Sequence, residues 1–346
     1  MMRYNDRWRG NLSIYSDFLE NIMKAYRFLL TFACVVLVLC ICSCSGEVLQ
    51  TGTPGGSGQL GTGEMVTTDS SGGIGGSLTP GDAFANAEHM LTVRVLKTGK
   101  SDCMLLKLDD TVIMIDTADA DDYGEISDML ESLGMSKIDY LILTHFDNDH
   151  IGSAARIIED FEVAQVYMPN YVRDSGLYRS LMSALDKNAS RTTVNRLNDD
   201  TTVPLPVGSL WINVSRVYPE LSHEEPIPED SMDNNLSLIC GLTFGDFSAL
   251  FMGDAEKERC EDFNAQTQYA GQYDFIKLPH HGSHNKALRD LLTACDVKYG
   301  VICSDALANI ELEVVNLMRN LGALTYYSYN GTMVLRTDGI TVECVQ

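Results

Sequence analysis

The clearest signal in the sequence is Thr144-His145-Phe146-Asp147-Asn148-Asp149-His150. It follows the apolar run 140–143, which predicts a short buried strand, and it precedes residues 153–160, which have helical spacing. Two imidazoles and two carboxylates, all common metal ligands, therefore stand at a strand-to-helix junction. Because crowded carboxylates repel one another without a cation, the stretch predicts a metal site. The competing interpretation is a solvated acidic turn with two incidental histidines.

Two further groups of candidate ligands also follow apolar strands. Asp254 comes after the run 248–252, and His280-His281-Gly282-Ser283 comes after the run 275–278. Strand ends hold side chains on a rigid edge, so distant segments of the chain can meet there. Taken alone, Asp254 and Asp116 would be ordinary turn or cap residues. Five of the seven histidines lie in 144–150 and 280–284, and this clustering favours one shared site.

The pattern from residue 89 onward favours a layered α/β fold. The alternating runs 91–96, 103–108 and 111–115 indicate an antiparallel meander. Residues 236–244 and 248–252 indicate a hairpin around Gly245-Asp246. Stretches with helical spacing fall between the groups of strands. Two sheets packed face to face, with helices on the outside, would bury the apolar faces of both sheets. The pattern also allows a single mixed sheet.

Together these stretches resemble the metallo-β-lactamase-fold hydrolases, and most of all the competence-type branch typified by the hydrolase domain of the DNA-uptake protein ComEC. The resemblance runs from about residue 91 to the C-terminus. Its markers are, in chain order, Leu96-Lys97-Thr98-Gly99-Lys100-Ser101-Asp102, Ile115-Asp116-Thr117, the 145–150 cluster with Gly152, Asn235-Leu236-Ser237, Met252-Gly253-Asp254-Ala255-Glu256 and His280-His281-Gly282-Ser283.

The resemblance implies an αββα four-layer sandwich that holds one or two divalent metals, Zn²⁺ or Mn²⁺, at one edge. It also implies supporting or substrate-facing roles for Asp116, Asn235, Ser237 and Ser283. Asp149 would orient water or accept its proton, and His280 would face the substrate, although the sequence leaves open which of His280 and His281 is the ligand. The implied metal ligands are His145 and Asp147 at a first position, Asp149, His150 and His281 at a second, and Asp254 as a bridge between them.

One departure from the family pattern concerns the first metal position. Between His150 and Asp254 the only histidine is His223, which lies in a Pro- and Glu-rich stretch. The middle histidine that relatives usually carry is therefore not evident. Asn235 and Ser237 occupy the region of an Asn-x-Ser pattern, so the first position is expected to be weak or completed differently.

The ligand types predict a metal-dependent hydrolase, and the resemblance suggests phosphoester or phosphodiester bonds as its substrate. The alternatives are a lactone or other ester hydrolase on the same fold, and a catalytically silent binding lipoprotein. The formal net charge of −23 repels polyanions. We therefore expect a small or single-stranded phosphorylated substrate and no tight binding of duplex DNA.

The N-terminal segment 1–44 resembles an export signal. Met23-Lys24-Ala25-Tyr26-Arg27 precedes the apolar run 28–41, which is short for a bilayer span, and Met23 is a plausible start. Ile41-Cys42-Ser43-Cys44 resembles a bacterial lipobox and predicts lipidation of Cys44; simple secretion and a retained helix are the alternatives. Residues 45–88 predict a Gly/Ser-rich tether, and 89–346 the hydrolase domain. The expected location is the extracellular face of the bacterial membrane.

Overall fold

The computed structural model describes residues 84–85 and 87–346. The predicted signal segment, Cys44 and nearly all of the 45–88 tether lie outside the described residues, so these boundaries stay predictions. Within the described part of the chain, no helix is both long enough and apolar enough to cross a bilayer.

The first of two sheets has eight strands in the order β15-β14-β1-β2-β3-β4-β5-β6. Strands β1, β2 and β3 pair antiparallel as the predicted meander, whereas β3, β4, β5 and β6 are parallel neighbours. The strands are β1 (Leu91–Val95), β2 (Met104–Leu108), β3 (Thr111–Ile115), β4 (Lys137–Ile142), β5 (Glu162–Pro169), β6 (Thr193–Leu197), β14 (Met333–Thr337) and β15 (Val342–Val345).

The second sheet has seven strands in the order β13-β12-β11-β10-β9-β8-β7. Strands β9 and β10 form the predicted hairpin, and β10, β11, β12 and β13 are parallel neighbours. The strands are β7 (Thr201–Val203), β8 (Ser209–Asn213), β9 (Ile239–Phe244), β10 (Phe247–Phe251), β11 (Phe275–Lys277), β12 (Tyr299–Ile302) and β13 (Leu324–Tyr327).

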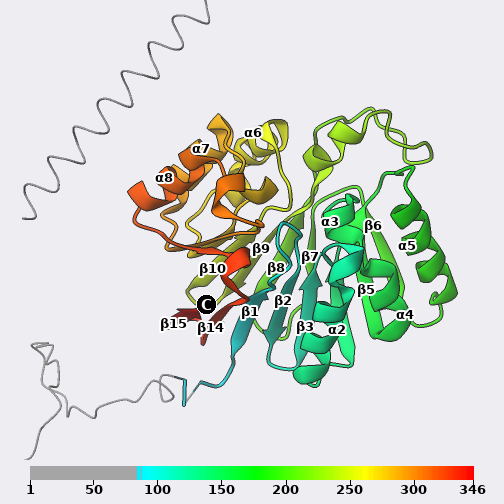
Figure 1. Ribbon diagram of the computed structural model, residues 1–346, viewed down its shortest axis with the longest axis horizontal. Coiled ribbons are helices and arrows are strands. Elements are labelled where there is room, and N and C mark those ends of the chain that lie inside the picture. Colours follow the sequence, from blue (N-terminus) through cyan, green and yellow to red (C-terminus); the bar gives the residue numbers. More distant parts are fainter. Residues whose placement is uncertain (1–83, 86) are drawn as a thin grey trace, which may run out of the picture. The chain divides into compact units, whose positions relative to one another are not determined.

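Helices cover the outer faces of both sheets, with α2, α4 and α5 on one side and α6, α7 and α8 on the other (Figure 1). The α-helices are α2 (Tyr123–Ser132), α3 (Asn148–Ile151), α4 (Ala154–Asp160), α5 (Gly176–Lys187), α6 (Lys257–Ala265), α7 (Lys286–Cys295) and α8 (Leu312–Asn320). Short 3₁₀ turns are η1 (Ala120–Asp122), η2 (Asp230–Met232), η3 (Asn234–Leu236), η4 (Thr267–Tyr269), η5 (His280–Gly282), η6 (Leu307–Asn309) and η7 (Ser328–Asn330).

Helix α7 shows how the sequence determines this packing. The side chain of Asn285 accepts a hydrogen bond from the Leu288 amide at 2.8 Å and caps the first turn. Leu288, Leu292 and Cys295 recur at helical spacing and are buried against the second sheet. The helix therefore begins at its cap and is held by one apolar face.

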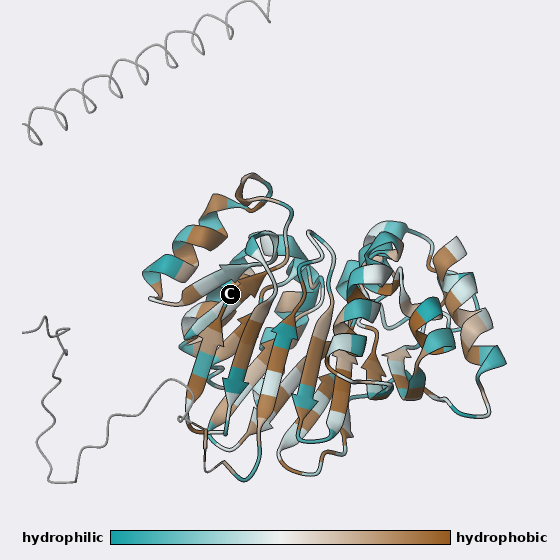
Figure 2. Ribbon diagram, turned by 60° about the horizontal axis from the view of Figure 1, so that its bottom comes forward, coloured by the Kyte–Doolittle hydropathy of each residue, from teal (hydrophilic) through white to brown (hydrophobic). Residues whose placement is uncertain are grey.

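Three hydrophobic clusters fill the spaces between the four layers. The first joins Leu141 to Ile157 of α4, the second lies between the sheets and contains Phe275, and the third joins Ile276 to Leu288. Phe275 and Ile276 enter different clusters because successive side chains of a strand point to opposite faces. Figure 2 shows the strands as mainly hydrophobic and the helices as mixed, as expected when each helix buries only one face.

The predicted αββα sandwich is thus confirmed, and the alternative of one mixed sheet is wrong. Sequence patterning did not predict β6, β7 or β8, which are short, and β6 is largely half-exposed or exposed. All six cysteines of the described chain are free, and Cys103, Cys240 and Cys303 are buried core residues.

Candidate metal centre

Four strands end at the same edge of the sandwich, and the residues that follow them carry the candidate ligands. Asp116 follows β3, the 145–150 stretch follows β4, Asp254 follows β10 and His281 follows β11. Strands β3 and β4 are parallel neighbours, as are β10 and β11, so their carboxyl ends meet in pairs. Ligands commonly bind at this edge of parallel strands.

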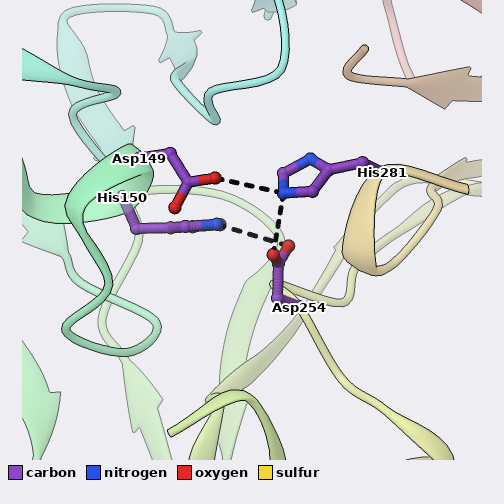
Figure 3. Close-up of side chains that lie close together, drawn as sticks. All are labelled: Asp149, His150, Asp254 and His281. Atoms are coloured by element: carbon purple, nitrogen blue, oxygen red, sulfur yellow. Dashed lines mark ion pairs between the residues drawn. The ribbon is translucent and has the colours of Figure 1, made fainter. Parts of the chain in front are cut away.

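Asp149, His150, Asp254 and His281 point toward one another at this edge (Figure 3). One ligand atom from each lies within 4.8 Å of the ligand atoms of the others. His281 Nε2 is 2.9 Å from Asp254 Oδ2 and 3.3 Å from Asp149 Oδ2, and His150 Nε2 is 3.3 Å from Asp254 Oδ1. We call these four residues the quartet.

The quartet fits a divalent metal. Within the described residues, the buried atoms His150 Nε2, Asp254 Oδ1 and His281 Nε2 make no hydrogen bond. Buried polar atoms normally have a partner, so these three atoms are suited to a cation. Two imidazoles with two carboxylates form a donor set that suits Zn²⁺ or Mn²⁺.

Asp116 fixes the orientation of His150 from behind the quartet. Its carboxylate accepts hydrogen bonds from the Thr144 amide and hydroxyl, both at 2.8 Å, and lies 2.8 Å from His150 Nδ1. His150 Nδ1 therefore donates to Asp116, which leaves Nε2 for the metal. Asp116 itself has a φ of 58°, an unfavourable conformation for a residue with a side chain.

Gly152 allows the ligand helix to approach the Asp116 loop closely. A Cβ at this position would lie 2.3 Å from the Ala120 amide nitrogen and 2.6 Å from Asp119 Cα. The Gly152 amide donates to the Ala118 carbonyl at 2.8 Å across the same contact. Glycine is therefore required here for space, because any side chain would push α3 away from the loop.

The two histidines of the quartet bind protons more tightly than a free imidazole does. Burial lowers the pKa of His150, but the charges of Asp254, Asp116 and Asp102 outweigh it and hold the pKa well above its ordinary value. Burial likewise lowers the pKa of His281, and Asp254 and Asp149 reverse the effect. The acidic neighbours therefore favour the protonated form of both rings, and a metal must compete with protons for them.

Lys277 is a charged residue of the site that sequence reasoning missed. It ends β11 on the inner face of the sheet, is fully buried, and pairs with the buried carboxylate of Asp102. Its ammonium also donates to the Gly253 carbonyl at 2.9 Å and lies 3.6 Å from Asp254 Oδ1. The available signal was a lysine within the otherwise apolar strand Phe275–Lys277, since lysine is almost never buried unless paired.

His145 and Asp147 do not join the quartet. His145 Nε2 is buried and lies 3.7 Å from Asp147 Oδ2, and no further His, Cys, Asp or Glu of the described chain completes a ligand group with them. Instead, Arg173 binds the other oxygen of Asp147 at 2.8 Å. Sequence reasoning did not single out Arg173, which lies in the loop between β5 and α5.

The remaining predicted site residues lie around the quartet. His280 is half-buried and turns to Glu256, with Nδ1 3.3 Å from Oε1, while its neighbour His281 turns to Asp254. Asn235 accepts from the Arg259 amide at 3.1 Å, and the Ser237 hydroxyl accepts from the Asp254 amide at 3.3 Å. Ser237 therefore braces the backbone at Asp254, and Asn235 braces the first turn of α6. Ser283 directly follows η5 and is half-buried.

The sequence model of the metallo-beta-lactamase superfamily matches residues 96–306, and this chain belongs to that superfamily. Membership implies a hydrolase with one or two divalent metals. The resemblance to the competence-type branch is confirmed by ComE operon protein 3 of Bacillus subtilis (strain 168), to which the chain is 29% identical over 175 residues. That alignment covers 50% of this chain and 21% of the relative, so the chain matches about a fifth of the relative's length.

Solved structures with related folds include two at low sequence identity. The metallo-beta-lactamase fold protein YhfI from Bacillus subtilis is 10% identical, with a TM-score of 0.46 covering 71% of this chain and 100% of that one. CmlA, a diiron beta-hydroxylase from Streptomyces venezuelae, is 14% identical, with a TM-score of 0.47 covering 71% of this chain and 54% of that one.

Proposed function

We propose that this chain is a metal-dependent hydrolase of phosphoester or phosphodiester bonds that acts outside the bacterial membrane. The main support for hydrolase activity is the quartet, a largely buried set of two imidazoles and two carboxylates at the edge of a metallo-β-lactamase fold. We propose Zn²⁺ or Mn²⁺ as the metal. When bound, such a cation acidifies water and stabilises an anionic transition state.

The chain's own residues would position water and substrate around the quartet. Asp149 Oδ2 lies between His281 at 3.3 Å and the Lys100 ammonium at 3.2 Å, and we assign it the role of orienting water and accepting its proton. Lys100 is 55% exposed and offers a positive charge to an anionic substrate. Burial lowers the pKa of His280, so its ring is neutral near pH 7 and is suited to a hydrogen bond with the substrate.

A small or single-stranded substrate agrees with the charge around the site. The cavity beside Asp149 is lined by Lys100 and Asn148, but also by Asp119, Asp121 and Asp305. These carboxylates, together with the net charge of −23, oppose a long polyanion such as duplex DNA. The preference for phosphorus over a carbonyl centre rests on the similarity to the competence-type branch.

The proposed location rests on the export signal and Cys44, which lie outside the described residues. A Cys44→Ala variant expressed in the source cell type should shift from the membrane fraction to the soluble or secreted fraction. A variant that stays with the membrane would contradict lipidation at Cys44 and favour a retained apolar helix.

Turnover assays with defined substrates test the activity. Protein loaded with Mn²⁺ or Zn²⁺ should hydrolyse bis-p-nitrophenyl phosphate or labelled single-stranded DNA, and Asp254→Asn should lose this activity while the exposed-turn variant Asp246→Asn keeps it. Hydrolysis of lactones or nitrocefin without any of phosphoesters would favour the alternative ester hydrolase. Bound metal without turnover of any substrate would favour a binding lipoprotein.

A further inference from the structure

The position formed by His145 and Asp147 lacks the ligands that a metal needs. It offers one imidazole nitrogen and one carboxylate oxygen, 3.7 Å apart, and no third ligand residue of the described chain joins them. Protein zinc sites have at least three protein ligands. His145 Nε2 is buried and makes no hydrogen bond within the described residues, so it too is suited to a cation, but a single imidazole nitrogen does not make a metal site.

A positive charge already lies on Asp147. The Arg173 guanidinium approaches Asp147 Oδ1 to 2.8 Å, and only 12% of the Arg173 side chain is exposed. Its second terminal nitrogen pairs with Asp233, whose side chain is fully buried. Arg173 is therefore a bridge between two carboxylates, which is the geometry that a metal ion often has.

Asp233 holds this bridge in place. The Phe146 amide donates to Asp233 Oδ1 at 3.2 Å, and the Tyr171 hydroxyl donates to the same oxygen. Phe146 belongs to the ligand stretch itself, so Asp233 ties the guanidinium to the backbone next to Asp147. Burial raises the pKa of Asp233 to about 7, so this carboxyl depends on a nearby cation to stay ionised. Movement of Arg173 out of the site would remove that cation.

We propose that Arg173 takes the place of the second metal ion, so that this chain binds a single divalent cation, at the quartet. The inference rests on the proposed metal-dependent function and defines its metal centre as mononuclear. A guanidinium cannot lose its proton in a protein, so it cannot become neutral to admit a neighbouring cation. A metal on Asp147 Oδ2 would share one carboxylate with this permanent charge and would be repelled by it.

Metal stoichiometry of the full chain tests the proposal without reference to activity. Mn²⁺ titration followed by calorimetry and elemental analysis should give one ion per chain at saturation. Electron paramagnetic resonance should show isolated Mn²⁺, because two ions in a shared site lie only about 3.5–4 Å apart and couple magnetically. Two ions per chain, or a coupled signal, would overturn the inference of a single metal ion but would leave the proposed function standing. No bound ion would contradict both the inference and the proposed function.

Variants of Arg173 supply the second test. Arg173→Met removes the charge while it keeps an unbranched side chain. It should admit a second Mn²⁺, held by His145 and by the two carboxylates that the guanidinium releases, Asp147 and Asp233. Arg179→Met is the matched control. Among the described residues Arg179 pairs only with the exposed Asp174, so this variant should leave the stoichiometry at one. A folded Arg173→Met protein that still binds one ion would show that the guanidinium does not exclude the second. If Arg173→Met does not fold, the wild-type measurements decide.

Discussion

Replacing the buried Lys277 by methionine should destabilise the protein more than any change to a surface lysine. The substitution keeps a long, flexible side chain but removes the ammonium that pairs with Asp102. Both side chains are fully buried, and both Asp102 oxygens make no hydrogen bond within the described residues. The Gly253 carbonyl, which accepts from Lys277 at 2.9 Å, would also lose its donor.

The magnitude follows from the burial of the pair. Removing one partner of a buried ion pair costs about 3–5 kcal/mol, because the remaining charge is left without compensation. A domain of this size loses about 2–4 °C in Tm for each kcal/mol, so Lys277→Met should melt roughly 6–20 °C lower. The double variant Asp102→Asn/Lys277→Met should recover at least half of the loss, since it leaves no unpaired charge.

Thermal and urea unfolding of the metal-free protein, with a chelator present, measure these changes without stabilisation by bound metal. Lys298→Met serves as the control. Lys298 lies just before β12 and pairs with Asp274 at 2.6 Å, but its side chain is 65% exposed. Such a surface pair contributes less than about 1 kcal/mol.

Two outcomes would refute this reasoning. If Lys277→Met is no less stable than Lys298→Met, the buried ammonium does not compensate Asp102. If the double variant is as unstable as Lys277→Met, the loss arises from packing around the methionine and not from the unpaired carboxylate.

Gly152→Ala should lower the free energy of unfolding in urea by about 1–3 kcal/mol, because the new Cβ would clash with backbone atoms. Gly176→Ala is the control, since its Cβ would have nothing within 4 Å, and equal losses in the two variants would refute the steric argument. Asp116→Asn should weaken metal binding about 10–100-fold in calorimetry, and an unchanged Kd would show that Asp116 does not support His150. Metal binding should release protons, and metal affinity should rise with pH, because acidic neighbours raise the pKa of His150 and of His281. Calorimetry in buffers of different ionisation enthalpy measures the number of protons released, and a release of zero would contradict the expectation. In the metal-free protein, the attraction between the protonated His150 and His281 rings and their acidic neighbours should stabilise the fold fully below about pH 6.5, the ordinary pKa of histidine. This stabilisation is lost as the pH rises through the raised pKa values of the two rings, and unfolding measured at several pH values checks the loss.

Local pattern was sufficient for most of the strands and helices and for the stretches that carry the candidate ligands. Each ligand stretch directly follows an apolar run that forms a strand, as 140–143 precedes His145 and β10 precedes Asp254. A strand has apolar residues at every second position or in a short run, and polar residues follow its end. Strands and their ends can therefore be recognised without knowing which other strands lie beside them. Strand β6 escaped prediction because much of it is exposed and has little apolar pattern.

Tertiary structure decided which of two adjacent histidines meets Asp254. His280 and His281 both have positive φ, 43° and 53°, which turns their rings in different directions. His281 faces Asp254, and His280 faces Glu256. Sequence alone could not choose between them, because two neighbouring histidines after one strand have the same local pattern.

The order of these motifs along the chain therefore indicated the family and the layered fold, and it supplied the imidazoles and carboxylates that could be ligands. The pairing of Lys277 with Asp102 and of Arg173 with Asp147 was decided only by the tertiary structure. Each pair joins residues far apart in the chain, and their meeting depends on which face of a strand or loop each side chain occupies after the sheets have packed. The sequence does not show which residue a charged side chain will pair with, because electrostatic attraction depends on distance in space and not on separation along the chain.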